Sequence, residues 1–360
     1  MISVSDDVIR TWPRLLELAA GGRAIGAQIE CLDLSGTDLQ GFDLRMTRWV
    51  SVSLAGAKLA GALLGGATLE GADLEGADLR GADLAGATLA RARLASARLE
   101  GASLAGADLA QADLRGAQLD RTLFTGTDLG GAVLTGLDFS TCRVQAAKLG
   151  AADLSGARFF LADFSGVDFR ACRVDERTEL RQCLLIGADF SEMTLAGARL
   201  RDATLMDAKL AGANLMRADA QQASFARADL RKARLGGISA RRADFSGARL
   251  DGADLSQASL EDAELSKITA LQAMFRGARM HKARLVGADL RGASFEAATL
   301  TWADLSHADL SAAVLKDALL DFANLHRAEL RAANTSGAST ANARQTDPDR
   351  SAAENFSTRG

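Results

Sequence analysis

The sequence predicts an all-β solenoid in which the chain turns once in every five residues. Between residues 72 and 84 the triplet Ala-Asp-Leu recurs with a spacing of five, so that Leu74, Leu79 and Leu84 are equivalent. On a helix this spacing would place successive leucines about 140° apart around the axis. In one continuous strand the odd spacing would place them on alternating faces. Neither a helix nor one continuous strand fits this spacing, so we expect a chain that turns once in each repeat.

The repeat extends from Leu34 to Leu330 and changes its register once. Its central residues lie at every fifth position from Leu34 to Val174 and again from Leu180 to Leu330, which gives 29 plus 31, or 60, repeats. The centre is Leu or Phe in 53 repeats, and the residue two positions before it is Ala in 44. A large and a small residue that recur together are expected to point inward. Gly often follows two positions after the centre, where a turn is needed.

This pattern resembles the pentapeptide-repeat family. The family motif combines a small residue such as Ala, then Asp or Asn, Leu or Phe, a Ser, Thr or Arg, and a variable residue. The resemblance covers about 300 of the 360 residues, with frequent Gly in the last position and Arg in place of Asp in many repeats. It implies a right-handed quadrilateral β-helix with four repeats in each coil.

The charged residues support four repeats per coil independently. In a coil of 20 residues, outward side chains 20 positions apart lie next to each other, where opposite charges are favourable. The residues that precede the centres form 18 opposite-charge and 4 like-charge pairs at a spacing of 20, but 12 and 8 at a spacing of 15. The repeats then make about 15 coils with a length of roughly 70 Å.

The array divides the chain into five segments. In order, we expect a short helical cap, the first part of the array, a one-residue register slip, the second part of the array and a disordered tail, at residues 1–28, 29–174, 175–179, 180–343 and 344–360. In the cap, Ser5-Asp6-Asp7 and Thr11-Trp12-Pro13 are typical helix starts, and Gly21-Gly22 is a typical stop. The extra residue of the slip should bulge a corner or kink the array.

Composition and charge exclude several classes of protein. The net charge of −4 gives no bulk positive charge for nucleic acid. No apolar run approaches the ~18 residues of a membrane helix. The first segment lacks the basic-then-apolar layout of a signal peptide, so a cytoplasmic location is the default, with export by a signal-less route left open.

Cysteine, histidine and aspartate often serve in catalysis or metal binding, but in this sequence each has a structural explanation. Cys142, Cys172 and Cys183 occupy the inward small position, where cysteine behaves as a small hydrophobe. His307 and His326 fall one coil apart, but two ligands without a closed geometry do not predict a metal site. Asp recurs because the repeat does, and no catalytic triad or phosphate-binding glycine motif stands out. We expect no enzyme activity, no cofactor and no metal site.

Deviations from the regular repeat are the candidate interaction sites. Residues 217–249 carry 8 basic and 3 acidic side chains. Within this stretch Ala220 and Ala240 replace the central Leu on one face of adjacent coils, which predicts an indentation or a locally collapsed wall. The candidate interaction surface joins these positions to the slip and consists of Arg227, Arg231, Lys232, Arg234, Arg241, Arg242, Ala220, Ala240, Asp175, Glu176, Arg177 and Glu179.

The sequence favours a non-enzymatic, rigid scaffold for protein–protein interaction in a bacterial cell. We expect a monomer or weak end-to-end homodimer that binds a protein partner, with no direct nucleic acid and no membrane, and an open edge near Leu330 that invites strand pairing. The family resemblance implies two alternatives: a DNA mimic that modulates type II topoisomerases such as DNA gyrase, and an accessory or cargo-linked component of a bacterial secretion system. Mimicry of DNA needs a strongly negative surface, whereas residues 33–174 sum to −3 and residues 175–333 to zero.

Overall fold

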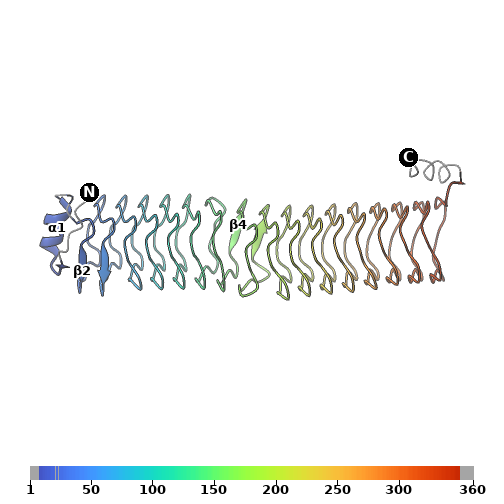
Figure 1. The fold of residues 1–360 in the computed structure, drawn as a ribbon, viewed down its shortest axis with the longest axis horizontal. Coiled ribbons are helices and arrows are strands. Elements are labelled where there is room, and N and C mark those ends of the chain that lie inside the picture. Colours follow the sequence, from blue (N-terminus) through green and yellow to red (C-terminus); the bar gives the residue numbers. More distant parts are fainter. Residues whose placement is uncertain (1–7, 21, 23, 349–360) are drawn as a thin grey trace, which may run out of the picture. The chain divides into compact units, whose positions relative to one another are not determined.

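The computed structural model describes residues 8–20, 22 and 24–348, which form two compact units that meet in sequence at Glu179 and Leu180. In each unit the chain winds through successive coils, as Figure 1 shows. Almost all bridges are parallel and join residues 20 positions apart, such as Asp83 with Ser103 in unit 1 and Asp254 with Met274 in unit 2. Both units are therefore β-solenoids in which one coil holds four repeats.

Unit 1 begins with a strand, a helix and two further strands (Figure 1). These elements are β1 (Val8–Ile9), α1 (Trp12–Ala20), β2 (Gln28–Glu30) and β3 (Arg48–Val50). β1 pairs with β2, and β2 pairs with β3, both in parallel. Val8 lies opposite Gln28, and Gln28 lies opposite Arg48, so these strands already follow the 20-residue register.

Helix α1 begins where the second predicted helix start lies. Trp12 is its first residue, Pro13 is in its first turn, and the amide of Leu15 donates to the carbonyl of Thr11 at 3.2 Å. Leu15 and Leu18 are buried, so the apolar face of the helix packs inward. The other predicted start, residues 5–7, lies outside the described residues, and the residues that follow it form β1 instead of a helix.

Each repeat consists of a short extended segment, here called a wall, and a tight turn. In one repeat of unit 1, Thr88 donates its amide to the carbonyl of Ala67 at 2.9 Å, and Leu89 donates to Asp108 at 2.6 Å. The turn is closed by the amide of Ala92, which donates to Leu89 at 3.0 Å. A wall contributes so few paired residues that most of the sheet consists of isolated bridges instead of long strands.

The interior is filled by the central residues and the small residues before them. Leu74, Leu79 and Leu84 are fully buried, as are most of the inward alanines. Full burial of a Leu or Phe side chain contributes about 1.5–3 kcal/mol, so stability accumulates with each coil. In unit 2 the interior also contains two stacked phenylalanine pairs, Phe225 with Phe245 and Phe275 with Phe295, at ring-centroid distances of 4.9 and 4.8 Å.

The last part of unit 1 contains the register slip. Its strand β4 spans Arg158–Phe160, and β5 spans Glu179–Arg181 and so begins at the last residue of the unit. The amide of Glu179 donates to the carbonyl of Ala157 at 2.9 Å, a span of 22 positions, whereas Arg173 and Ala152 make the regular bond over 21. The extra residue is taken up in the turn between Asp175 and Thr178, before the centres resume at Leu180.

Unit 2 continues past residue 343, where the sequence predicts the end of the array. The amide of Arg344 donates to the carbonyl of Ala323 at 2.8 Å, and the amide of Asp347 donates to Nδ1 of the buried His326 at 3.1 Å. Small inward residues persist up to Ala343, so the backbone still pairs although the large centres have ended. The predicted tail therefore starts too early, and its residues 349–360 lie outside the described residues. No helix among the described residues is both long and apolar enough to cross a membrane.

Candidate interaction surfaces

The six candidate cations encircle unit 2 instead of sharing one face. The parallel bridges define four columns of outward residues, which pass through Ser224, Asp229, Arg234 and Ser239. The candidate cations occupy or directly follow these columns in chain order: Arg227, Arg231, Lys232, Arg234, Arg241 and Arg242. They form a belt about one coil high, here called the cationic belt, and the structure does not gather them into a single basic patch.

Three cations of the belt are engaged within the chain. Arg227 donates from Nε and Nη2 to the two carboxylate oxygens of Asp207 at 2.8 and 2.7 Å. Arg231 binds Asp229 with the same fork, at 2.7 and 2.5 Å. Arg234 directs Nη2 toward a methionine sulfur at 3.1 Å. All three side chains are held in place, and the carboxylates partly neutralise the charges of Arg227 and Arg231.

The other cations of the belt are more available. Arg241 lies 3.8 Å from the carboxylate of Glu261, at the limit of an ion pair. Lys232 and Arg242 are exposed, and within the described residues neither has an ion-pair partner. A charge without an internal partner is free to pair with a second molecule, so Lys232 and Arg242 are the members of the belt best suited to binding.

The two alanine centres do not interrupt the wall that carries them. Ala220 and Ala240 are fully buried, and their amides donate to Ser239 and Ser259 at 2.7 and 2.8 Å, as in regular repeats. The next centre along each coil is a fully buried phenylalanine, Phe225 after Ala220 and Phe245 after Ala240. The ladder therefore continues where the sequence predicts an indentation or a locally collapsed wall, and each alanine centre is followed by a centre larger than Leu.

A hollow beside the cationic belt was not predicted from the sequence. It encloses about 560 Å³ on unit 2, next to Arg227. Asp244 and Glu264 line it together with Lys267 and the short side chain of Ser246. Asp244 and Glu264 belong to one column, the one that passes through Ser224, and Ser246 and Lys267 follow them in the chain, so the hollow extends along one face over successive coils.

The register slip forms a closed, hydrogen-bonded turn. Oδ1 of Asp175 accepts the amides of Gly156 at 2.8 Å and Arg177 at 3.1 Å, and Oδ2 accepts Nε and Nη2 of Arg177 at 3.0 and 2.8 Å. The Thr178 hydroxyl donates to Oδ1 at 3.1 Å. Partial burial acts to raise the pKa of Asp175, but these hydrogen bonds outweigh it, and the pKa lies below its ordinary value.

The remaining slip residues differ in exposure. Glu176 is exposed, whereas the side chain of Glu179 is only 13% exposed and lies 3.7 Å from Nε of Arg158. A surface pocket of about 320 Å³ lies beside the turn and is lined in part by Arg177. The turn is therefore firmly built, and Glu176 is the side chain that it offers most freely to a partner.

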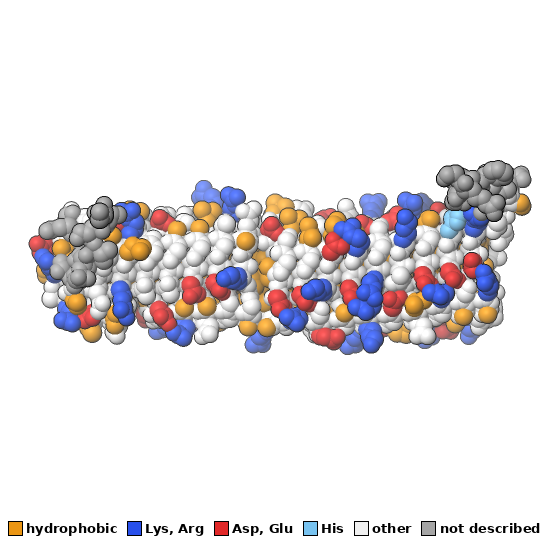
Figure 2. Space-filling model, in the orientation of Figure 1, with side chains coloured by type: hydrophobic (Ala, Val, Ile, Leu, Met, Phe, Trp, Pro, Cys, Tyr) orange, Lys and Arg blue, Asp and Glu red, His pale blue; other side chains and the backbone are white. Residues whose placement is uncertain are grey.

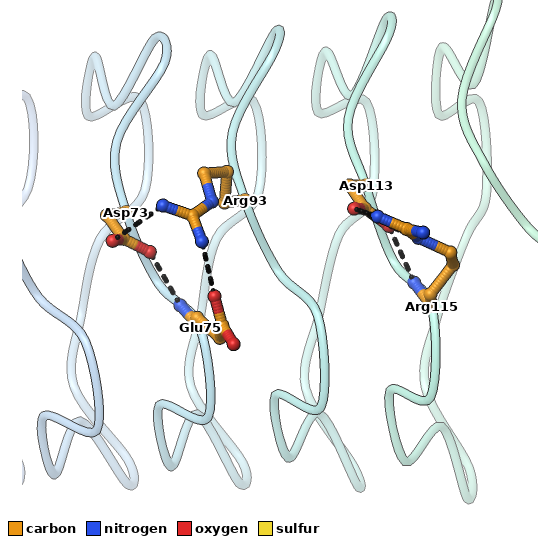
Figure 3. A network of polar contacts seen from close by, with 5 residues as sticks. All are labelled: Asp73, Glu75, Arg93, Asp113 and Arg115. Carbon is orange, nitrogen blue, oxygen red and sulfur yellow. Dashed lines mark hydrogen bonds and ion pairs between the residues drawn. The ribbon is translucent and has the colours of Figure 1, made fainter.

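Charged residues pair within repeats as well as between coils. An Asp before the centre and an Arg after it form a two-pronged bond, here called the clamp, at Asp43/Arg45, Asp78/Arg80, Asp113/Arg115, Asp168/Arg170, Asp229/Arg231 and Asp289/Arg291. Figure 3 shows one clamp near a bond between coils, in which Arg93 lies 3.2 Å from Asp73 and also reaches Glu75. The sequence argument compared charges 20 positions apart and so missed the pairs two positions apart.

The clamps predict that acid weakens the array. The Arg hydrogen bonds hold the pKa of Asp43, Asp78, Asp113, Asp229 and Asp289 below its ordinary value. A lowered folded-state pKa gives stability that is present above the unfolded value of about 3.9 and is lost as the pH falls through the folded value. The melting temperature should therefore fall below about pH 4, by a modest amount per clamp because the pairs are largely exposed.

Thermal unfolding followed by circular dichroism between pH 7 and pH 3 tests this expectation. The double variant Arg80→Gln with Arg231→Gln removes the arginine of two clamps and should lose less melting temperature between pH 7 and pH 3 than the wild type. Arg217→Gln removes an arginine outside the clamps and should show the same acid-induced loss as the wild type. An equal loss of melting temperature at low pH in the clamp variant and in Arg217→Gln would show that the clamps do not cause the acid sensitivity.

Burial disfavours the thiolate form of two inward cysteines, Cys142 and Cys172. Burial raises the pKa of Cys142 to about 12 and that of Cys172 to about 11. Their Sγ atoms lie 2.9 and 3.2 Å from the carbonyls of Leu119 and Leu149 and donate to them. Thr122 and Thr127 use the same inward position to donate to carbonyls 23 residues earlier. The thiols therefore occupy the position and make the hydrogen bond that a threonine hydroxyl makes elsewhere in the array.

Among the described residues, no group of three or more His, Cys, Asp or Glu side chains is arranged to hold a metal ion.

The sequence matches the family described as pentapeptide repeats (8 copies) in overlapping stretches that together cover residues 31–174 and 183–337. This chain belongs to the pentapeptide repeat family. The matches stop at residue 174 and resume at 183, so the interval between them contains the register slip. No curated protein matches the chain.

Several solved pentapeptide repeat proteins are similar to the chain. HetL of the cyanobacterium Nostoc sp. strain PCC 7120, which is involved in the regulation of heterocyst differentiation, is 27% identical, with 92% of this chain and 94% of that chain covered and a TM-score of 0.23. A protein of the thylakoid lumen of Arabidopsis thaliana is 33% identical over 29% of this chain and 66% of its own, with a TM-score of 0.23. QnrB1, a plasmid-mediated fluoroquinolone resistance protein, is 19% identical over 63% and 97%, with a TM-score of 0.26. Because these TM-scores are low, the family assignment depends on the sequence match.

Proposed function

We propose that this pentapeptide repeat protein is a non-enzymatic scaffold that binds a protein partner through the outward side chains of its coils. The observation that carries the proposal is the fixed display of charge: the 20-residue ladder holds outward side chains in columns, and Lys232 and Arg242 are exposed without an ion-pair partner in the described residues. A backbone that is already ordered loses little conformational entropy on binding, which favours such a surface over a flexible one.

The charge distribution distinguishes this proposal from mimicry of duplex DNA. On the face drawn in Figure 2, Lys and Arg side chains lie beside Asp and Glu side chains in both units. A mimic of DNA needs a surface that is mainly negative, because the phosphate charge dominates binding to DNA-binding proteins. We therefore place modulation of a type II topoisomerase behind the scaffold role. Nothing in the residues favours a role in secretion.

Several finer features belong to the proposal. We infer right-handed coils, about 15 in all, with α1 as a cap whose buried Leu15 and Leu18 cover the first coil. The four cysteines are free, which suits the reducing cytoplasm of a bacterial cell. We also infer a monomer or a weak end-to-end homodimer, because the coil that follows Leu330 presents backbone groups at the end of the ladder.

Charge reversal in the cationic belt tests the proposed function. Lys232→Glu combined with Arg242→Glu should reduce recovery of the bound partner at least about tenfold, since like charges placed across an interface are strongly unfavourable. The measurement is quantitative mass spectrometry of proteins that co-purify with the full chain from its native cells. Lys58→Glu, which reverses an exposed lysine of unit 1, is the matched control and should leave recovery unchanged. Equal recovery of the partner with the wild-type chain, the double variant and Lys58→Glu would show that the cationic belt is not the binding surface.

A further inference from the structure

One turn of unit 2 exposes two large aromatic side chains on adjacent coils. Trp302 and Phe322 stack with ring centroids 4.5 Å apart and an interplanar angle of 5°, yet their side chains are 52% and 41% exposed. Their φ angles are 63° and 61°, in the left-handed region that Gly occupies in many other turns, such as that of Gly252. A bulky residue is unusual in this conformation. Neither the turn nor the interior therefore explains why aromatic residues lie here.

The same turn position carries a charge on each of the three coils before Trp302. Arg242, Asp262 and Lys282 precede it at spacings of 20, and these three residues with Trp302 and Phe322 are here called the corner ladder. The amides of Asp262 and Lys282 each donate to a carbonyl of the following coil, at 2.9 and 3.0 Å, so the turns are held in register. All three charged side chains are exposed, and within the described residues none has an ion-pair partner. Their charges are therefore available to a second molecule.

Two copies of the chain match their corner ladders when they lie antiparallel. A two-fold axis midway between the coils of Asp262 and Lys282 places Asp262 of each copy opposite Lys282 of the other, because a symmetric contact makes every pair twice. The same axis places Arg242 of each copy opposite Trp302 of the other. A guanidinium is attracted to the indole ring, so these pairs are favourable as well.

Other arrangements of the two ladders lack this match. In parallel copies related by a two-fold axis, each charge lies opposite itself. A shift of the antiparallel copies by one coil places either Asp262 or Lys282 opposite itself. A shift by two coils in one direction leaves no ion pair in the ladder, and in the other direction it sets the carboxylate of Asp202 against Trp302, whose ring face is negative. The unshifted antiparallel contact alone combines ion pairs with the contact of Arg242 and Trp302.

We propose that the corner ladder is the contact through which two copies of the chain form a weak, antiparallel, side-to-side dimer. Exposed Trp and Arg side chains are the residues that most often dominate the binding energy of an interface. The contact involves one turn on each of a few coils, which is less than a standard interface buries, so dimers form only at high protein concentration.

The inference goes beyond the scaffold role and beyond the end-to-end contact, because it uses the side of unit 2 instead of its last coil. Arg242 belongs both to the cationic belt and to the corner ladder. A second copy therefore competes with the bound partner for this side chain.

An exchange of charges tests the dimer, with sedimentation velocity of the full chain over a range of concentrations as the measurement. Asp262→Lys alone and Lys282→Asp alone each place like charges in both symmetric pairs and should weaken self-association at least about tenfold. The double variant restores opposite charges and should associate as the wild type does. Lys232 and Asp202 adopt the same positive φ in equivalent turns, so the turn accepts both substitutions.

Two single variants identify the other residues of the contact. Trp302→Ala should weaken self-association at least about tenfold. Asp202→Lys changes a charge at the same turn position, opposite an uncharged residue in the proposed arrangement, and should associate as the wild type does. A wild-type chain that stays monomeric at millimolar concentration, single reversals that associate normally, or a double variant that stays weak would overturn the proposal. None of these variants changes Lys232 or Arg242, so partner recovery through the cationic belt is tested independently.

Discussion

Replacing Phe245 with alanine is expected to lower the free energy of unfolding of unit 2 by about 3–5 kcal/mol, the usual cost of deleting a buried phenyl ring. Phe245 is fully buried, stacks on Phe225 with an interplanar angle of 8°, and follows a centre that is already small at Ala240. In the variant two neighbouring centres would both be alanine, so the interior would have no large side chain on two adjacent walls. Chemical denaturation of the full chain measures the effect.

Two further variants test whether the loss of stability depends on the buried volume that Phe245 occupies beside Ala240. Phe322 also stacks face to face, on Trp302 at 4.5 Å, but it is 41% exposed, so Phe322→Ala should cost about 1 kcal/mol or less. Adding Ala240→Leu to Phe245→Ala returns a large centre to the same coil and should recover part of the lost stability. A Phe245→Ala variant no less stable than Phe322→Ala would mean that the rings do not compensate for the alanine centres.

The regular part of the fold could be predicted from the sequence because it depends on two local rules. The large centre and the small residue before it recur in every coil, and opposite charges recur 20 positions apart. Both rules act between residues at fixed spacing, such as Asp73 and Arg93, and the structure shows the same spacing in its bridges. The position of the slip followed from the same count.

The departures from regularity could not be predicted because they depend on volume and on several coils at once. Ala220 alone suggests a void, whereas its backbone pairs regularly and the next centre, Phe225, is a fully buried ring. The amides of Leu119 and Leu149 lack the regular backbone bond to the next coil within the described part of unit 1, although both lie in repeats with a regular Leu centre. Most of the candidate surface residues are charged and half-buried or exposed, but their distribution around the coil follows only from the winding of the chain.

The 20-residue coil underlies every proposal made for this protein, and a pair of engineered cysteines tests it directly. Thr88 and Asp108 form a parallel bridge, and adjacent strands lie about 4.8 Å apart, within the range of about 4.4–6.8 Å that a disulfide spans between Cα atoms. Ser103 lies 15 positions from Thr88 and belongs to another column, the one that contains Asp83. The two pairs therefore separate a four-sided coil from a three-sided one.

The measurement is the yield of the intramolecular disulfide after mild oxidation, in a background that carries Cys31→Ser to remove the exposed native thiol. With four repeats per coil, Thr88→Cys with Asp108→Cys should cross-link nearly completely, and Thr88→Cys with Ser103→Cys should remain reduced. The opposite result, a disulfide at a spacing of 15 and none at 20, would contradict the coil on which the columns and the cationic belt depend.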